Sequence, residues 1–308
     1  MIAVWRPHPQ RRLRGTERCV QKPPHPTPHI ANGPISSTIT SPVRHKLDMR
    51  LSVVIPTLDE QACIARCVES ALRLGAIEVV VADGGSVDAT RGLAERAGAI
   101  VVQAPAGRGG QLNRGAEAAG GDTLLFLHAD TRLPPEAADQ IASAFHDPAT
   151  VHGAFRQRID AAERRYRWLE WGNALRVSRL GVPYGDQALF VRRSAFDDIG
   201  GFPDEPLMED VVIARRLRRL CRPALLDGPL HVSARRWRRR GVVRQTLTNW
   251  TLLAAWSLGV PPKKLAAWYD PASPRRCADV ANGAGVANGA DVERPVPEPA
   301  APSAGCSR

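Results

Sequence analysis

The sequence predicts an α/β fold with a doubly wound, mainly parallel sheet flanked by helices. Residues 124–127 are four consecutive large apolar residues, which is typical of a strand buried on both faces. The apolar runs at 51–55 and 79–82 have the same character, and helical apolar spacing lies between the runs. This alternation of strand and helix indicates an open α/β architecture, formed by one domain.

The predicted elements follow one another in a regular order. Glycines mark the ends of several helices, among them Gly75 and Gly98. Strand 151–159 alternates apolar and polar residues, which predicts that the sheet becomes mixed. In chain order we expect strand 51–55, helix 60–74, strand 77–82, helix 87–97, strand 100–103, helix 108–119, strand 123–127, helix 135–146, strand 151–159, helix 164–180, strand 188–191 and a helix from Glu209 to about Arg219.

A folded domain is predicted for residues 49–270, with a tail on each side. Residues 1–48 hold eight of the 26 prolines and no periodic apolar pattern, which is typical of a disordered extension. Residues 271–308 are a low-complexity tail rich in Ala, Gly and Pro. Met49 directly precedes the first strand, so we hypothesise that the natural product begins there and that deletion of 1–48 preserves stability and activity.

Acidic residues follow three of the predicted strands. Asp59 and Glu60 come after the first strand, Asp83 after the second and Asp130 after the fourth. Ligands of open α/β sheets bind outside the carboxyl ends of the strands, so these groups are expected to converge on one edge. That edge is the predicted active site.

For several residues of this predicted edge, both a ligand-binding role and a purely structural role fit the sequence. Asp83 can accept hydrogen bonds from a ribose or a base, while Asp88 fits a ligand contact and a helix cap equally. His128 and Asp130 alternate along a strand end and can bind a divalent cation next to a diphosphate. The alternative is that this pair only ends the strand, with the ring nitrogens of His128 hydrogen-bonded within the fold.

The second half of the chain supplies a candidate base and a candidate anion contact. Glu209 and Asp210 open a helix, where a carboxylate either complements the helix dipole or removes a proton from a hydroxyl. The basic run 235–240 fits a solvated surface or a polyphosphate contact, with Trp237 packed beneath the arginines. Residues 107–113 lack the Gly-Lys-Ser/Thr ending of a P-loop.

The formal net charge of +11 is unevenly distributed. It is +6 in residues 1–48, −6 in 49–213, +10 in 214–244 and +1 in 245–308. The predicted site therefore lies in a net acidic segment, which disfavours a broad nucleic-acid surface. A local contact between 214–244 and a polyanion fits better, and we expect no nucleic-acid partner.

No sequence feature indicates export or a membrane span. The six cysteines form no C-x-x-C pair, which favours a reducing, cytoplasmic location over a zinc site or a disulfide framework. The N-terminus lacks the apolar core of a signal peptide, and no apolar stretch is long enough to cross a bilayer. The segment Leu247–Val260, followed by Lys263 and Lys264, fits either a helix packed on the domain or a peripheral contact of 247–264 with the inner face of the cell membrane.

Seven short motifs occur in the order found in family 2 glycosyltransferases with the GT-A fold, and the chain resembles that family over residues 51–245. More narrowly, it is similar to a small bacterial His-Ala-Asp subgroup described as associated with radical-SAM or selenium-domain genes. The motifs are residues 53–60, 81–88, 107–113, 126–130, 185–187, 208–210 and 235–237.

The resemblance implies a nucleotide-diphospho-sugar donor, a hydroxyl acceptor, Mg²⁺ or Mn²⁺, and inversion at the anomeric carbon by direct displacement. It implies that Asp130, with His128, holds the metal, and that Asp210, or alternatively Glu209, is the base. The residues that it assigns to the donor are Pro56, Asp59 or Glu60, Asp83, Asp88, Arg108 and Gln111. Those that it assigns to the diphosphate or the acceptor are Asp186, Gln187, Arg235, Arg236 and Trp237.

Two departures from the family pattern affect these expectations. The usual Asp-x-Asp is here His128-Ala129-Asp130, so one carboxylate is missing and the metal dependence stays open. The Gln-x-x-Arg-Trp of processive members is replaced by Val-Ser-Ala-Arg-Arg-Trp at 232–237. Together with the lack of membrane spans, this favours transfer of a single sugar over polymer synthesis and export.

Two functions of other kinds stay open beside this one. A nucleotidyltransferase on a related sheet would use Asp83 and Asp130 and would release pyrophosphate. A non-enzymatic protein would bind nucleic acid or an anionic membrane through the arginines of 214–244, with an affinity that falls steeply with salt. The sugar, the oligomeric state and the acceptor are undetermined, and a lipid, a carotenoid-like alcohol, a peptide or a small metabolite all fit as acceptors.

Overall fold

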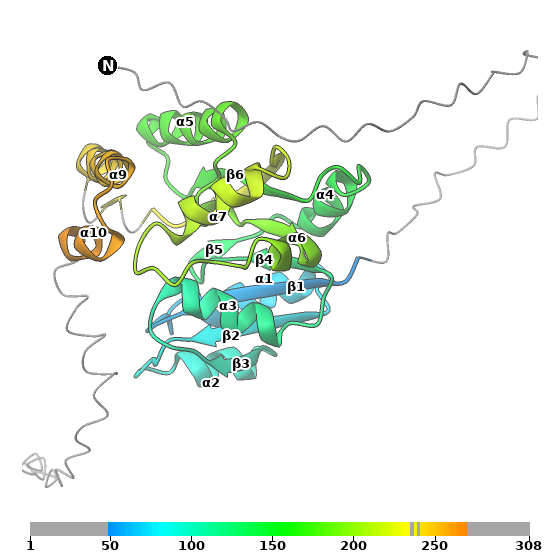
Figure 1. The fold of residues 1–308 in the computed structure, drawn as a ribbon. Helices are drawn as coiled ribbons and strands as arrows, with labels where there is room; N and C mark the ends of the chain where they lie inside the picture. Colours follow the sequence, from blue (N-terminus) through cyan, green and yellow to red (C-terminus); the bar gives the residue numbers. More distant parts are fainter. Residues whose placement is uncertain (1–48, 235–236, 239–240, 270–308) are drawn as a thin grey trace, which may run out of the picture. The chain divides into compact units, whose positions relative to one another are not determined.

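The computed structural model describes residues 49–234, 237–238 and 241–269, which belong to one unit of the chain, residues 46–308. The tails predicted at 1–48 and 271–308 lie outside the described residues. The described strands form one eight-stranded sheet with the order β3-β2-β1-β4-β7-β6-β8-β5 (Figure 1). The sheet is mainly parallel in its first half and mixed beyond it, which confirms the predicted α/β class.

The first half of the sheet is parallel, and the strands inside its edge are almost entirely buried. Every residue of β1 is buried except Pro56, which is half-buried, and this burial explains the unbroken apolar sequence. The four parallel strands are β1 (Leu51–Thr57), β2 (Glu78–Asp83), β3 (Ile100–Gln103) and β4 (Thr123–Phe126). The helices between and after them are α1 (Ile64–Arg73), α2 (Thr90–Arg96), α3 (Arg108–Ala118) and α4 (Ala137–Ala144).

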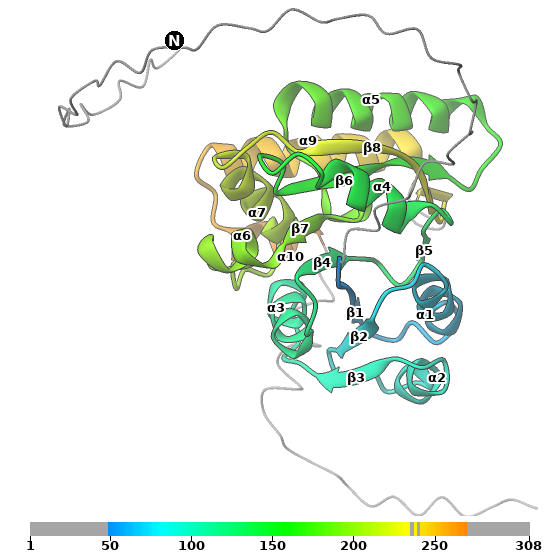
Figure 2. The same cartoon turned by 90° about the vertical axis from the view of Figure 1, so that its right-hand side faces the viewer.

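Alternate residues of β1 belong to two separate core layers. Val53 and Ile55 pack with α1, α2 and α4, whereas Val54 packs with α3. This follows from the two-residue period of a strand. Figure 2 shows α3 on one side of these strands and α1 and α2 on the other.

The second half of the sheet changes direction. β7 (Phe190–Arg192) is antiparallel to β4 and to β6 (His152–Ile159), and β6 runs parallel to β8 (Ala224–Val232). β5 (Thr131–Arg132) closes the sheet edge antiparallel to β8. The sequence analysis did not identify β5 or β8, because β5 has two residues and β8 shows no regular alternation of buried and exposed positions.

Helices of the second half surround the carboxyl edge of β1 and β4. Helix α5 (Arg164–Leu180) has the predicted bounds, and α7 (Glu209–Arg218) ends one residue before the predicted position. Leu252 and Leu265, from the last two helices, pack against Met208 at the start of α7. The remaining elements are α6 (Arg193–Asp198), the 3₁₀ turn η1 (Gly185–Gln187), α9 (Val242–Ser257) and α10 (Pro262–Tyr269). None of the helices in the described part of the chain is long and apolar enough to cross a membrane.

Candidate active site

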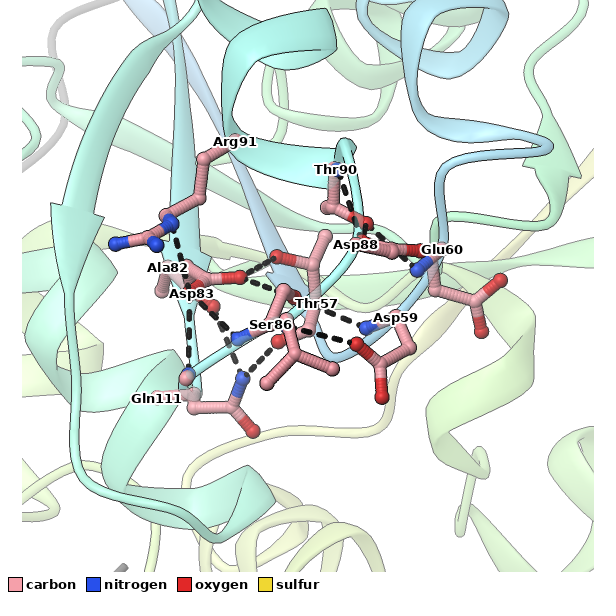
Figure 3. Close-up of polar contacts among 12 residues, drawn as sticks. Thr57, Asp59, Glu60, Ala82, Asp83, Ser86, Asp88, Thr90, Arg91 and Gln111 are labelled. Carbon is pink, nitrogen blue, oxygen red and sulfur yellow. Dashed lines mark hydrogen bonds and ion pairs between the residues drawn. The ribbon is translucent and has the colours of Figure 1, made fainter. Parts of the chain in front are cut away.

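Hydrogen bonds join the loops that follow β1 and β2. The backbone N–H of Asp59 donates to Ser86 Oγ at 2.9 Å, and Val87 N–H donates back to Asp59 Oδ1 at 3.0 Å. Glu60 N–H donates to Thr90 Oγ1 at 2.8 Å (Figure 3). These bonds occupy the residues before α1 and α2, so both helices start later than the predicted residues 60 and 87.

Asp83 is fully buried at the end of β2. Its carboxylate accepts the N–H groups of Gly85 and Ser86 at 3.1 and 3.0 Å, and Arg91 Nε lies 3.9 Å away (Figure 3). Asp83 therefore holds the turn at Gly84 and Gly85 in place, and this role does not depend on a bound ligand.

Asp88 lies just before α2 and caps the turn into it. Its carboxylate accepts hydrogen bonds from the backbone and side chain of Thr90 and from the N–H of Gln61. Burial is the largest single influence and disfavours the ionised form, but the hydrogen bonds together outweigh it and lower the pKa of Asp88 below its ordinary value. Both uses that the sequence left open, cap and ligand contact, involve an ionised Asp88, and the structure shows the capping bonds.

Gln111, on α3, ties the ends of β1 and β2 together. Its side-chain amide donates to the carbonyl oxygens of Thr57 at 2.7 Å and of Ala82 at 3.0 Å (Figure 3). A Cβ on Gly84 would lie 2.8 Å from the same amide nitrogen, so Gly84 leaves the room that Gln111 needs. Both amide hydrogens are therefore used within the fold.

A hollow at the carboxyl edge gathers residues that are far apart in the sequence. It is lined by Pro56 from β1, Arg108 from the start of α3, His128 from the loop after β4, Gly185 from η1, and Asp210 from α7. Glu209 lines it as well. Five of the predicted site residues thus meet in one cavity: Pro56, Arg108, His128, Glu209 and Asp210.

Arg108 connects two of these groups. Its Nε lies 3.5 Å from Oε1 of Glu209, and its Nη2 lies 3.3 Å from Nδ1 of His128. The start of α3 is packed so closely that a Cβ on Gly109 would lie 2.2 Å from the carbonyl oxygen of Pro203. This packing places a cation in the lining of the hollow.

The two neighbouring carboxylates of α7 have different environments. Glu209 is only 4% exposed, and burial raises its pKa; Arg108 opposes this increase and Asp210 adds to it. Asp210 is half-buried, its Oδ2 accepts the N–H of Gly185 at 2.9 Å, and its Oδ1 accepts the N–H of Val211 at 2.8 Å. Asp210 is therefore the more accessible of the two and is held in a fixed orientation.

Gln187 is buried inside η1. Its Oε1 accepts hydrogen bonds from the N–H of Tyr184 at 3.1 Å and from Arg176 Nη2 at 2.9 Å. The guanidinium of Arg176 also lies over the ring of Tyr184, 3.3 Å from its centroid. Gln187 thus shapes the turn that presents Gly185, and it does not line the hollow.

Asp186 also lies outside the residues that line the hollow. Its carbonyl oxygen accepts a hydrogen bond from Gln157 at 2.9 Å, and its buried Oδ1 has no hydrogen-bond partner among the described residues. The structure therefore places Asp186 within η1 but outside the lining of the hollow.

His128 and Asp130 line different hollows. Strand β4 ends at Phe126, and Thr131 donates from its N–H to the carbonyl oxygen of His128 at 3.1 Å, which turns the chain at Ala129 and Asp130. His128 lines the hollow with Asp210, whereas Asp130 lines a larger one with Cys63, Arg132 and Arg238 on the side of β5. The expectation that both side chains alternate along an extended strand end was wrong, because the strand is too short. Nowhere in the described ranges do three or more His, Cys, Asp or Glu side chains form a metal-binding group.

Trp237 packs into the fold instead of lining either hollow. It lies edge-on to Tyr166 of α5, with ring centroids 6.5 Å apart, and contacts a cluster that includes Ile159. Arg235 and Arg236, which were predicted to meet a diphosphate or an acceptor, lie outside the described residues.

Three non-glycine residues of the described part have a left-handed backbone, and all three flank this site. Asp59 (φ 54°) follows β1, Ala188 (φ 51°) follows η1, and Met208 (φ 70°) precedes Glu209. Such conformations are unfavourable for residues with a Cβ and are concentrated at functional sites. They turn the chain sharply at the three loops that border the hollow.

The sequence analysis did not single out several residues that organise the site. Ser86 and Thr90 hold the two loops together, and the Asp-Gly-Gly-Ser motif was the signal that could have identified Ser86. Tyr184 and Arg176 position η1, but Arg176 is one of several arginines on α5 and carries no distinguishing signal in the sequence.

Comparisons with known proteins agree with this architecture. Residues 52–202 match the family model described as Glycosyl transferase family 2. The chain is similar to a PGL/p-HBAD biosynthesis glycosyltransferase of Mycobacterium tuberculosis, with 31% identity over 221 residues that make up 64% of this chain and 80% of that protein. It is also similar to an undecaprenyl-phosphate 4-deoxy-4-formamido-L-arabinose transferase of Pseudomonas aeruginosa, with 33% identity over 130 residues, 38% of each chain.

Among solved structures, the fold resembles that of S. aureus TarS 1-349. The two share 19% sequence identity with a TM-score of 0.50, over 60% of this chain and 61% of that one. At this identity the likeness concerns the arrangement of the sheet and helices.

Proposed function

Because the chain belongs to glycosyltransferase family 2, we propose that it transfers one sugar from a nucleotide-diphospho-sugar to the hydroxyl of an acceptor, with inversion at the anomeric carbon. In this reaction the acceptor oxygen forms a bond to the anomeric carbon while the bond to the diphosphate breaks. The hydroxyl proton passes to a base of the protein, and a nucleoside diphosphate leaves.

The observation that carries the proposal is the position of Asp210. Its carboxylate lines the hollow and is oriented by the N–H of Gly185, as a general base must be oriented toward the proton that it removes. Glu209 is a weaker candidate because it is almost fully buried and paired with Arg108. We therefore assign the base role to Asp210 and the positioning of Arg108 to Glu209.

Arg108 supplies positive charge where the leaving group develops negative charge. Its guanidinium lies in the same hollow as Asp210 and is held by Glu209 from one side. Charge that is already in place lowers the energy of a transition state more than charge that must move there. Arg108 is thus proposed to stabilise the departing diphosphate.

The donor's nucleoside is proposed to bind at the loops after β1 and β2. Pro56, at the end of β1, lines the hollow, and the exposed Asp59 lies in the loop that follows it. Asp83, Asp88 and Gln111 shape these loops from beneath through their hydrogen bonds. Their proposed contribution to donor binding is therefore to hold the loops, and Glu60 is proposed to line the same edge.

The predicted Mg²⁺ or Mn²⁺ does not fit a site shared by His128 and Asp130. The two side chains line separate hollows, and the cationic Arg108 lies against the ring of His128. We therefore derive no step of the reaction through a metal ion.

A lipid-linked acceptor is the class that we propose among those that the sequence left open. One relative is named as an undecaprenyl-phosphate transferase, and undecaprenyl phosphate is a lipid. The next subsection describes a surface of this chain that is consistent with such an acceptor.

The test is to identify the product that the full chain releases from a panel of nucleotide-diphospho-sugars, with a long-chain polyprenol or a short-chain alcohol as the hydroxyl acceptor. We expect a nucleoside diphosphate and a glycosylated acceptor from one donor. Release of pyrophosphate would instead support the nucleotidyltransferase alternative. No turnover and no donor-dependent thermal stabilisation, with every donor, would support the non-enzymatic alternative.

A further inference from the structure

Helix α9 exposes a continuous apolar stripe. Val243, Leu247 and Trp250 of α9 and Leu258, which directly follows the helix, recur at intervals of three to eight residues, and their exposed fractions are 72, 55, 68 and 86%. At about 100° per residue these positions, together with the exposed Ala254, fall on one side of the helix.

The opposite side of α9 already packs against the domain. Leu252 is buried in a cluster with Met208 and Leu265, and the ring of Trp256 lies 4.4 Å from the guanidinium carbon of Arg215. The helix is therefore apolar on two sides, and the exposed stripe is not needed for its packing. The two interpretations of residues 247–260, packing and surface contact, thus apply to opposite faces of the same helix.

Helix α10 extends this apolar surface. Trp268 is 62% exposed and lines a shallow hollow together with Val243, Leu247 and Thr251 of α9. Figure 1 shows α9 and α10 next to each other. Two helices therefore contribute aromatic and aliphatic side chains to one face.

The charged residues of α9 and α10 are all basic. The sequence contains no Asp or Glu between Asp227 and Asp270, and eight Lys or Arg residues lie in that interval. Three of these, Arg244, Lys263 and Lys264, are exposed on or beside α9 and α10. Exposed tryptophan with Lys and Arg is the composition of helices that lie in the interface of an anionic bilayer.

We propose that the face formed by Val243, Leu247, Trp250, Leu258 and Trp268 docks onto the surface of an anionic membrane. The apolar side chains enter the region between headgroups and acyl chains, while Arg244, Lys263 and Lys264 contact the lipid phosphates. The buried side of the same helices packs in a cluster with Met208 and Tyr184, and Tyr184 lines the hollow that contains Asp210. The inference concerns binding and stands independently of the sugar-transfer proposal.

The test is cosedimentation of the full chain with vesicles of equal parts phosphatidylcholine and phosphatidylglycerol, compared with phosphatidylcholine alone. We expect strong binding to the anionic vesicles only, weakened by salt. The variant L247S/W250S/W268S should lower the partition coefficient at least tenfold, and K263Q/K264Q should lower it roughly tenfold.

The matched controls are I77S and L220S, which replace apolar residues of similar exposure on other elements and should bind like the wild type. Far-ultraviolet circular dichroism establishes that each variant is folded, and the charge variant tests the proposal even if the triple variant does not fold. Equal binding to neutral and anionic vesicles would overturn the inference. So would binding that neither L247S/W250S/W268S nor K263Q/K264Q weakens. A second outcome would also overturn it: the wild type does not bind vesicles but forms a dimer, and the triple variant is a monomer. The partner of this face would then be a second copy of the chain.

Discussion

The guanidinium of Arg108 is paired with the buried carboxylate of Glu209, with 3.5 Å between Nε and Oε1. This pair joins the first residue of α3 to the first residue of α7, two helices that are about a hundred residues apart in the sequence. Since Asp210 is the next residue along α7, the pair also determines where the proposed base lies relative to a cation.

Replacing Asp210 tests the proposed base. Asp210→Asn keeps the size of the side chain and an oxygen that can accept the N–H of Gly185, but it cannot take up a proton. We expect kcat to fall on the order of 10²- to 10⁴-fold, with the dissociation constant for the donor nearly unchanged. Steady-state kinetics and calorimetric titration of the donor measure the two effects.

The control for that experiment is Asp204→Asn, which changes an exposed acid in the loop before α7. It should leave both quantities unchanged. Full activity of Asp210→Asn would exclude Asp210 as the base.

The pH dependence of stability tests the environment of Glu209. Because burial raises its folded-state pKa above the ordinary value of 4.5, Glu209 contributes most to stability below that pH, and the contribution is lost as the pH rises through the raised value. Glu209→Gln keeps the uncharged form at every pH. The difference in the free energy of unfolding, variant minus wild type, should therefore increase as the pH rises from about 4.5. Urea denaturation at a series of pH values measures it.

The exposed Glu117 provides the comparison for Glu209. Glu117→Gln removes a carboxylate whose side chain is 65% exposed, so the same urea series on this variant controls for the loss of a surface charge. A difference between Glu209→Gln and the wild type that does not vary with pH would contradict the raised pKa.

Gln111→Met tests whether Gln111 acts within the fold. The variant keeps a side chain of similar length but removes the donors to the carbonyl oxygens of Thr57 and Ala82, and we expect a loss of about 1–3 kcal/mol in the free energy of unfolding. Thermal and urea denaturation check this. Arg114→Met, an exposed change on the same helix, should cost little, and an equally small loss for Gln111→Met would show that the two hydrogen bonds are unimportant.

The close approach of α3 to the loop before α7 is tested by two neighbouring glycines. A Cβ at Gly109 would lie 2.2 Å from the carbonyl oxygen of Pro203, whereas the nearest atom to a Cβ at Gly110 is 3.6 Å away. Gly109→Ala should therefore destabilise the protein by about 1–3 kcal/mol and lower activity by displacing Arg108.

Gly110→Ala is the matched control on the same helix turn. It should be neutral or stabilise by up to about 1 kcal/mol, because Ala favours the helix more than Gly does. If the two variants unfold at the same urea concentration, the packing of α3 against Pro203 does not constrain the site.

The sequence predicted those elements whose signal is local. The bounds of α5 agree with the prediction, and β1, β2 and β4 lie where unbroken apolar runs predicted buried strands, whereas the edge strand β3 is partly exposed. Helices α1 and α2 start later than predicted because residues 57–61 and 83–90 bond to one another, and no local pattern reveals that pairing.

The sequence motifs indicated which residues lie near the candidate site, but not which of their side chains face the hollow. Asp210 and Pro56 were identified from motifs and do line one hollow, whereas Gln187 was identified in the same way and is buried within η1. Motif position indicates that a residue lies near the carboxyl edge, and packing then determines whether its side chain faces the cavity or the core.

The sequence by itself determined the α/β class and the positions of acidic residues directly after the strands, because the periods of strands and helices are local patterns. Only the tertiary structure decided that Arg108 lies between His128 and Glu209, that Asp130 faces a different hollow, and that α9 has an exposed apolar face. These outcomes depend on contacts between segments far apart in the chain, where packing and the pairing of buried charges select one side-chain arrangement from many that the same local pattern allows.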